Sequence, residues 1–441
     1  MRALLLMLAL ALVSPAALAK TRSRGSVGLE GRAFWGFWEN DRPTEDLGLA
    51  LEARVELAWD EDIWSARARV FGRVGALDLD RSILAPEELY LGISTDRVRV
   101  RVGALLFNWS ATEAFHPADV LNSRNFDSNL ENAEKLGEPM AWLEGHLWEG
   151  ARFEAMFMPA RIDPRLPGPR SRLAFIPSSF DLGGTPVALT LGDPLWTDRD
   201  GHVGSGHFAP QWGARISQVV GDADISLQAV RHSDRSQPVF VATDDALRQL
   251  GSTGSLELRP LYSFVTHVGL TYTQVVGDWV LKLEAAYRHF RRTDTTGLAR
   301  TGIFPLQQRD HLEIAGGLEY GWLWPGTDAE GTLLLEGQGY VYPDGRGDQF
   351  ESPFESDILI GYRHAFNDLA GRELLFTLIT DVTTGPELLI NLSYSQRISD
   401  VWSIAAALRV AHAPAPAGAI PEGLQVLDGD HQLRLTLTRH F

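Results

Sequence analysis

Alternation of apolar and polar residues with a period of two constrains the fold of this chain more than any other feature. In residues 401–411, "VWSIAAALRVA", every second residue from Trp402 onward is apolar and shares one face. Residues 279–289 and 387–399 repeat the pattern. Successive side chains of a β-strand point to opposite faces, so these segments predict strands with one apolar and one polar face.

About eighteen segments of this kind can be placed along the chain. Their predicted ranges are 26–38, 47–59, 63–74, 86–94, 97–107, 138–147, 150–158, 208–219, 222–231, 260–275, 279–292, 309–322, 330–342, 354–366, 371–381, 387–398, 401–411 and 431–441. The connections after even-numbered strands are short, and most of those after odd-numbered strands are long. An even strand count with this alternation predicts an all-β fold, a closed antiparallel transmembrane barrel with short periplasmic turns and long outer loops.

Tryptophan placement supports the same arrangement. Seven of the 13 tryptophans lie at or beside the short turns: Trp59, Trp64, Trp148, Trp279, Trp322, Trp324 and Trp402. An aromatic girdle of this kind marks the membrane interface of a barrel. A soluble β-sandwich or propeller can also alternate, but it does not require aromatic residues at one set of turns.

Composition narrows the possible functions. The chain has no cysteine, which excludes disulfides, thiolate metal sites and a cysteine nucleophile. Its net charge of −17 would repel nucleic-acid phosphates, so no nucleic-acid partner is expected. Residues 1–19 comprise one arginine, an apolar run and the closing Ala17-Leu18-Ala19, which predicts a signal peptide cleaved before Lys20. The predicted barrel therefore spans residues 20–441.

The last strand, "HQLRLTLTRHF", places Leu433, Leu435, Leu437, Arg439 and Phe441 on one face. It resembles the terminal strand of bacterial outer-membrane barrels, which ends on an aromatic residue. The resemblance implies that Phe441 belongs to a signal read by the barrel-assembly machinery, and that the chain resides in the outer membrane with the lipid bilayer as a partner. An open sheet edge is not viable in lipid, so this strand should pair with the first one.

A second resemblance covers about residues 86–170. The segments "PEELYLGIS", "VRVRVGALLFNWSATEAFHPADVLNSRNF" and "FMPARIDPRLP" are similar to large, poorly characterised proteobacterial porin-like barrels. "NSRNF" departs from the "N-P-R" spelling of those barrels. The resemblance implies porin-like transport and assigns no role to individual residues.

On the polar face of the first five predicted strands, arginines outnumber carboxylates. The pore-lining candidates there are Arg32, Arg54, Arg67, Arg69, Arg73, Arg99 and Arg101, with Glu30, Glu52, Glu56 and Glu88. Later strands contribute Glu284, Glu313, Glu319 and Glu336 beside Lys282, Arg288 and Arg363. A basic wall opposite a mixed or acidic wall would draw anions along the arginines. Alternatively, the charges pair across strands and solvate a filled lumen.

The long segment 108–137 has an interior that is unusual for a surface loop, because it carries Phe115, Val120, Leu121, Phe126 and Leu130. It can bury these groups by folding into the mouth of the barrel. There its acids Glu113, Asp119, Asp127, Glu131 and Glu134 would oppose Arg67, Arg69, Arg99 and Arg101 and form a constriction. Alternatively, the segment packs over the rim or against a neighbouring subunit. The longest predicted outer loop, 159–207, has no such assignment.

No catalytic, cofactor-binding or metal-binding residues are predicted. "HVGSGH" (202–207) lies in a Gly-rich loop and not at a strand-to-helix elbow. The acidic loops 197–201 and 342–357 suit calcium chemically but do not match the twelve-residue calcium loop. These patterns predict a cofactor-free outer-membrane channel, not an enzyme, for passive diffusion of small hydrophilic solutes, anions among them. An export barrel for an anionic polysaccharide or lipid, and a structural or adhesion barrel with partner-binding loops, remain alternatives, and the oligomeric state is left open.

Overall fold

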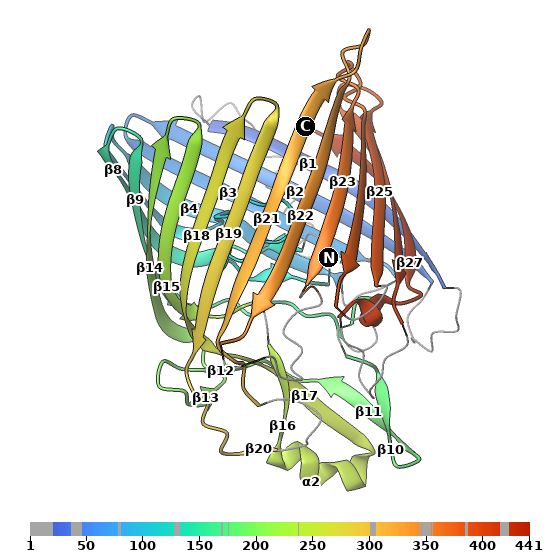
Figure 1. The fold of residues 1–441 in the computed structure, drawn as a ribbon. Coiled ribbons are helices and arrows are strands. Elements are labelled where there is room, and N and C mark those ends of the chain that lie inside the picture. The colour runs from blue at the N-terminus through green and yellow to red at the C-terminus, as the bar shows by residue number, and fades with distance from the viewer. Residues whose placement is uncertain are drawn as a thin grey trace.

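Eighteen antiparallel strands form one closed barrel in the computed structural model (Figure 1). The described residues are 21–36, 46–77, 81–127, 133–168, 171–174, 176–236, 238–299, 306–343, 345, 354, 356–383, 387–414 and 423–441. The predicted signal peptide, Leu130 and Glu131 lie outside them. No helix in the described part of the chain is long and apolar enough to cross a membrane.

The barrel strands match the predicted number and order. They are β1 (Thr21–Trp35), β2 (Leu47–Glu61), β3 (Trp64–Gly75), β4 (Ile83–Ser94), β5 (Val98–Leu105), β8 (Glu138–Trp148), β9 (Ala151–Ala160), β14 (Phe208–Val220), β15 (Ala223–Ser233), β18 (Phe264–Val276), β19 (Trp279–Phe290), β21 (His311–Leu323), β22 (Glu330–Val341), β23 (Asp357–Ala365), β24 (Glu373–Asp381), β25 (Leu388–Arg397), β26 (Trp402–His412) and β27 (His431–His440). The predicted fold class is therefore confirmed.

The first and last strands close the barrel. β1 pairs with β2 on one side and with β27 on the other, in a register that runs from Ser26 opposite His440 to Trp35 opposite His431. Two further hydrogen bonds join the backbones of Gly25 and Phe441, with N–O distances of 2.9 and 3.0 Å. A side chain at Gly25 would collide with the Phe441 ring, so the aromatic residue fits against a glycine.

The outer face of the barrel is apolar. Leu283 and Leu392, which the alternation places outside, expose 40% and 39% of their surface. Lumen-facing residues on neighbouring positions, such as Glu284 and Arg409, are buried. An apolar band outside and polar residues inside are what a barrel in lipid requires.

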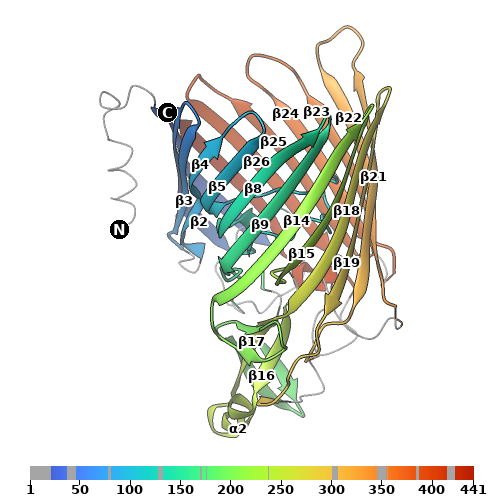
Figure 2. The same cartoon turned by 90° about the vertical axis from the view of Figure 1, so that its left-hand side faces the viewer.

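The two ends of the barrel differ (Figures 1 and 2). At one end, turns as short as Gly277–Asp278 join the strands, and Gly277 adopts a positive φ of 62°. Exposed tryptophans such as Trp64 and Trp148 lie beside these turns. The other end carries the long loops.

Three of the long loops fold together into a separate unit, which we call the outer lobe (Figure 2). Its seven-stranded sheet contains β10 (Ser179–Leu182), β11 (Thr185–Leu191), β12 (Leu195–Thr197), β13 (Val203–Gly204), β16 (Val239–Thr243), β17 (Ser255–Tyr262) and β20 (Leu298–Ala299). Helix α2 (Asp244–Thr253) begins at the N-cap Thr243, whose side chain accepts a hydrogen bond from Ala246 N. β17 pairs in parallel with β11 and β12, and buried Leu256 and Leu258 form part of the lobe core.

The lobe corrects one predicted strand. The alternation of 260–275 suggests a single barrel strand, but residues up to Tyr262 belong to β17 and the barrel strand β18 begins at Phe264. Both segments are extended, and alternation does not reveal which sheet a strand joins.

Candidate functional site

The predicted pore-lining arginines all lie on the lumen side of β1 to β5, and we call this set the arginine wall. Most of its guanidinium groups pair with carboxylates on neighbouring strands. Arg73 lies 2.7 Å from Glu52, Arg67 lies 3.7 Å from Glu56, and Arg99 lies 3.3 Å from Glu144. Arg32 lies 2.9 Å from Glu30 near the mouth, where both side chains are buried. Much of the wall's positive charge is therefore compensated locally.

Glu87 is a lumen residue that the alternation does not predict. The register between β3 and β4 shifts, so that Arg69 opposes Glu88 while Val70 opposes Pro86, and Glu87 is the extra residue of a bulge. Its carboxylate lies 2.8 Å from Arg54 and 2.9 Å from Arg69. The proline is the sequence sign of this bulge, because proline in a sheet is confined to edges and bulges.

Arg101 differs from the rest of the wall. Its guanidinium carbon lies 4.9 Å from the ring centre of Tyr90 and 5.3 Å from that of Trp142. It makes no ion pair with a carboxylate among the described residues. Cation–π contacts do not neutralise the positive charge of the Arg101 guanidinium.

The described residues 106–127 and 133–137, which we call the docked loop, lie inside the barrel. Residues 111–118 lie against the wall opposite the arginines, while Glu134 pairs with Arg73 on the arginine wall. The Glu284 carboxylate on β19 accepts hydrogen bonds from Ala111 N at 2.5 Å, Thr112 N at 2.9 Å and Ala118 N at 3.0 Å. On β22, Glu336 accepts from the next two backbone amides, those of Glu113 and Ala114, at 2.7 and 2.8 Å. Two wall carboxylates therefore hold one short stretch of loop backbone.

This arrangement corrects the predicted charge pairing of the loop. Glu113 pairs with Lys282 at 2.5 Å, and Asp119 pairs with Arg124 and Lys135 within the loop. Asp127 accepts a hydrogen bond from Ser171, while Glu134 pairs with Arg73. None of these described acids contacts Arg67, Arg69, Arg99 or Arg101. The prediction matched charges by sign, whereas backbone N–H groups hold the loop to the opposite wall.

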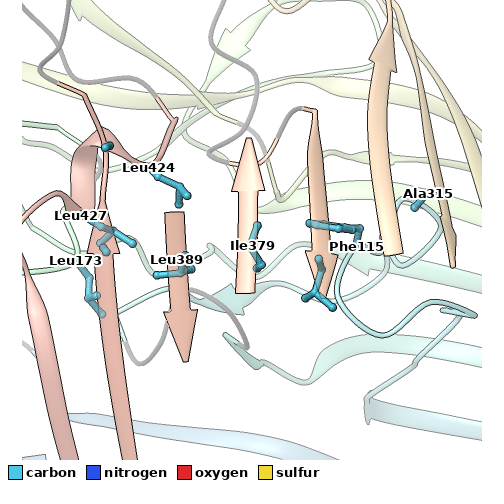
Figure 3. Close-up of a cluster of buried hydrophobic side chains, with 10 residues drawn as sticks. Phe115, Leu173, Ala315, Ile379, Leu389, Leu424 and Leu427 are labelled. Atoms are coloured by element: carbon cyan, nitrogen blue, oxygen red, sulfur yellow. The ribbon is translucent and has the colours of Figure 1, made fainter. Parts of the chain in front are cut away.

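Apolar side chains complete the docking. Phe115 is only 4% exposed and joins a buried cluster with wall residues Ile379 and Leu389, and with Leu173, Leu424 and Leu427 from two other loops (Figure 3). Farther along, Leu121 is buried beside Trp142. Loops therefore fill part of the mouth and narrow it.

The ionisable groups of the docked loop are strongly influenced by burial. Burial lowers the pKa of His116, outweighing the opposite effects of Glu284 and Asp119. Its Nδ1 lies 2.8 Å from the Ser110 hydroxyl. Burial also lowers the pKa of Lys135, although Asp119 opposes this. A neutral His116 adds no charge to the lumen at neutral pH.

The other predicted acids of this wall form ion pairs. Glu319 pairs with Lys282, and Glu313 lies 2.8 Å from Arg288. Arg288 also pairs with Asp234 at 2.9 Å. Near the short turns, Arg363 lies 2.8 Å from Glu373. The lumen charges on this side are thus mutually compensated.

Two cavities lie one after the other along β25 to β27. The first, of about 250 Å³, lies between the docked loop and the lumen face of β23 to β27. The second, of about 690 Å³, occupies the next lumen-facing positions towards the short turns and also touches Arg24, Arg54 and Arg69. Both cavities therefore lie on the same side of the barrel, and they share no lining residue.

The described residues contain no group of three or more histidine and acidic side chains that could hold a metal ion. In the acidic loop at 197–201, Asp198 accepts hydrogen bonds from the backbone amides of Asp200 and His202, at 2.8 and 3.0 Å. This carboxylate shapes the turn.

Comparisons with known proteins identify the fold. No family model and no curated protein matches the chain. Among solved structures, OpdL of Pseudomonas aeruginosa superposes with a TM-score of 0.52 at 12% identity, covering 96% of this chain and 99% of that one. OccK5 (OpdH) of the same organism gives 0.51 at 10% identity, with 96% and 98% covered. Wzi of Escherichia coli, described as a carbohydrate-binding barrel involved in group 1 capsule assembly, gives 0.50 at 9% identity, with 96% and 85% covered.

The chain has the fold of outer-membrane porin-like barrels. At these identities the similarity concerns the fold alone, and it confirms the porin-like resemblance predicted from the sequence.

Proposed function

We propose that this protein is an outer-membrane channel through which small hydrophilic solutes, with anions favoured, diffuse passively. The observation that carries the proposal is the pair of cavities along β25 to β27, one of which lies beside the docked loop. Eighteen strands enclose a lumen wider than its side chains fill. Residues 1–19 would direct export and be removed.

Anion preference follows from which charges remain uncompensated. Arg101 on the arginine wall and Arg434 on β27 make no ion pair with a carboxylate among the described residues. The carboxylates of the opposite wall are engaged by the docked loop, Lys282 and Arg288. Fixed positive charges lining a pore favour anions.

The test is single-channel recording of refolded protein, combined with liposome swelling. Replacing residues 114–132 by a short Gly-Ser linker removes the constriction and should raise conductance roughly twofold or more and admit larger solutes. Heat-modifiable mobility on gels checks that the variant folds. A folded wild-type protein that passes neither ions nor sugars would refute the proposal.

A second candidate rests on the outer lobe. Its compact sheet and helix, built from three loops, offer a folded surface outside the barrel. Wzi, a similar barrel, is described as carbohydrate-binding. If the swelling assay shows a sealed barrel, a structural or adhesion role, or export of an anionic polysaccharide or lipid, takes precedence.

A further inference from the structure

On β23 to β25, several residues that face the lumen are apolar, although the barrel otherwise has polar residues inside and apolar residues outside. Residues 374–380, "LLFTLIT", and 388–391, "LLIN", carry apolar residues on both faces, although Thr377 and Asn391 are polar and face the lumen. The alternation places Leu374 outside and therefore Leu375 inside. An apolar wall inside a water-filled lumen is unfavourable unless something covers it.

Loops cover only part of this wall. Phe115 and Leu424 pack against Ile379 and Leu389 (Figure 3). Leu375 remains 38% exposed. It lines the 250 Å³ cavity together with Phe115, Phe354, Leu359 and Ile379. One side of this cavity is therefore an apolar surface that the described residues leave partly exposed.

The other side of the same cavity offers hydrogen-bond donors and positive charge. Gln432 and Arg434 lie two residues apart on the lumen face of β27. Gln432 is only 6% exposed, yet its side-chain nitrogen has no hydrogen-bond partner among the described residues. The Arg434 guanidinium makes neither an ion pair nor a hydrogen bond within that part of the chain. A buried donor without a partner is costly and calls for a bound group.

The remaining charges around the cavity do not oppose an anion strongly. Glu113 lines it, but Lys282 holds this carboxylate at 2.5 Å. Arg409 adds a further positive charge to the lining. Arg32, which faces Arg434 across the seam, pairs with Glu30.

We infer that this cavity binds an amphipathic anion, a linear acyl or alkyl chain with a carboxylate or sulfate head. The chain lies against Leu375, Phe115 and Ile379, and the head accepts hydrogen bonds from Arg434 and Gln432. A purely hydrophilic solute would leave the apolar wall in water. A neutral apolar solute would leave both donors unsatisfied.

The inference goes beyond the proposed function, because it gives the channel an amphipathic ligand besides the hydrophilic solutes that diffuse through it. Because the proposed path for ions passes this cavity, an occupant would interrupt ion flow. Binding can therefore be followed as current block, and separately by equilibrium dialysis of labelled octanoate against the protein in lipid nanodiscs.

Octanoate should block the wild-type channel in a concentration-dependent manner, while acetate, which has the same head and no chain, should not. Arg434→Gln and Leu375→Asn should each weaken octanoate binding roughly tenfold or more. Arg152→Gln on β9 is the matched control. It removes an arginine that likewise makes no ion pair with a carboxylate among the described residues but lies away from this cavity, and it should retain the block. Comparing the binding of octyl sulfate with that of octanoate distinguishes a sulfate head from a carboxylate head.

Three outcomes would overturn the inference: acetate acting as well as octanoate, equal loss in all three variants, or no octanoate retained in dialysis. Dialysis separates this inference from the channel proposal. Conduction without octanoate binding would refute the inference and leave the channel proposal intact. Octanoate binding by a protein that conducts no ions would refute the channel proposal and support the inference.

Discussion

The two walls of the lumen use their charges differently. On β1 to β5, arginines and carboxylates of neighbouring strands neutralise one another, as Arg69 and Glu87 do. On β19 and β22, Glu284 and Glu336 instead bind the backbone of a distant loop. A carboxylate inside the barrel can therefore either neutralise a charge of the lumen or hold the docked loop in place. Which of the two it does depends on whether its partner is an arginine or the loop backbone.

Removing an anchor should have the largest effect. Glu284→Ala leaves the amides of Ala111, Thr112 and Ala118 without their acceptor, which should weaken docking of the loop by roughly 2–5 kcal/mol. Hydrogen exchange of these amides should accelerate and channel current should become noisier. Glu319→Ala is the control, since Glu319 pairs with Lys282 and not with loop backbone. Unchanged exchange in the Glu284 variant would contradict the anchoring role.

The contrast between the walls depends on the assignment of faces. Arginine at the outward-facing Leu283 should destabilise the barrel by about 2–4 kcal/mol, because the charge would lie in lipid. Arginine at the lumen-facing Ser393 should be tolerated. Chemical denaturation in lipid vesicles measures both. Equal destabilisation by both arginines would mean that the assigned register of the strands is wrong.

The pairing of β1 with β27 closes the barrel and places β27 beside the arginine wall. The strength of this pairing can be tested separately. Phe441→Asp removes the ring that lies against Gly25, which should cost about 1–2 kcal/mol and reduce the heat-modifiable species in outer membranes. Phe441→Tyr keeps the ring and should assemble normally. Normal assembly of the aspartate variant would show that the terminal aromatic is dispensable.

The smallest effect is expected on the arginine wall itself. Arg99→Gln combined with Arg101→Gln should reduce the preference for anions by about 1 kcal/mol, or roughly fivefold in the permeability ratio. Reversal potentials in a salt gradient measure this ratio. The double lysine variant should keep it, and an unchanged ratio in the glutamine variant would assign selectivity to other residues.

The sequence predicts the barrel well, because each strand must present one face to lipid and one to water. That constraint reveals the strands, the faces of Leu283 and Ser393, and the alternation of turns and loops. It does not predict that Glu87 faces the lumen, because the β-bulge at this residue interrupts the period-two alternation. Nor does it predict the docking of the loop, because the amides that bind Glu284 belong to every residue and leave no mark in the side-chain pattern. The sequence does not predict the outer lobe for a related reason. Extended segments have similar patterns whichever sheet they join.

The outer lobe also sets an order of events in time. Its strand β17 pairs with β11 and β12, and β16 pairs with β20, so the sheet draws on segments that precede β14, β18 and β21. Contacts between segments so far apart in the chain form slowly. The lobe cannot be completed until all three loops have been delivered to the same side of the membrane. Folding of the outer lobe would therefore be a late step, which can be completed only after the strands of the middle third of the barrel are correctly placed.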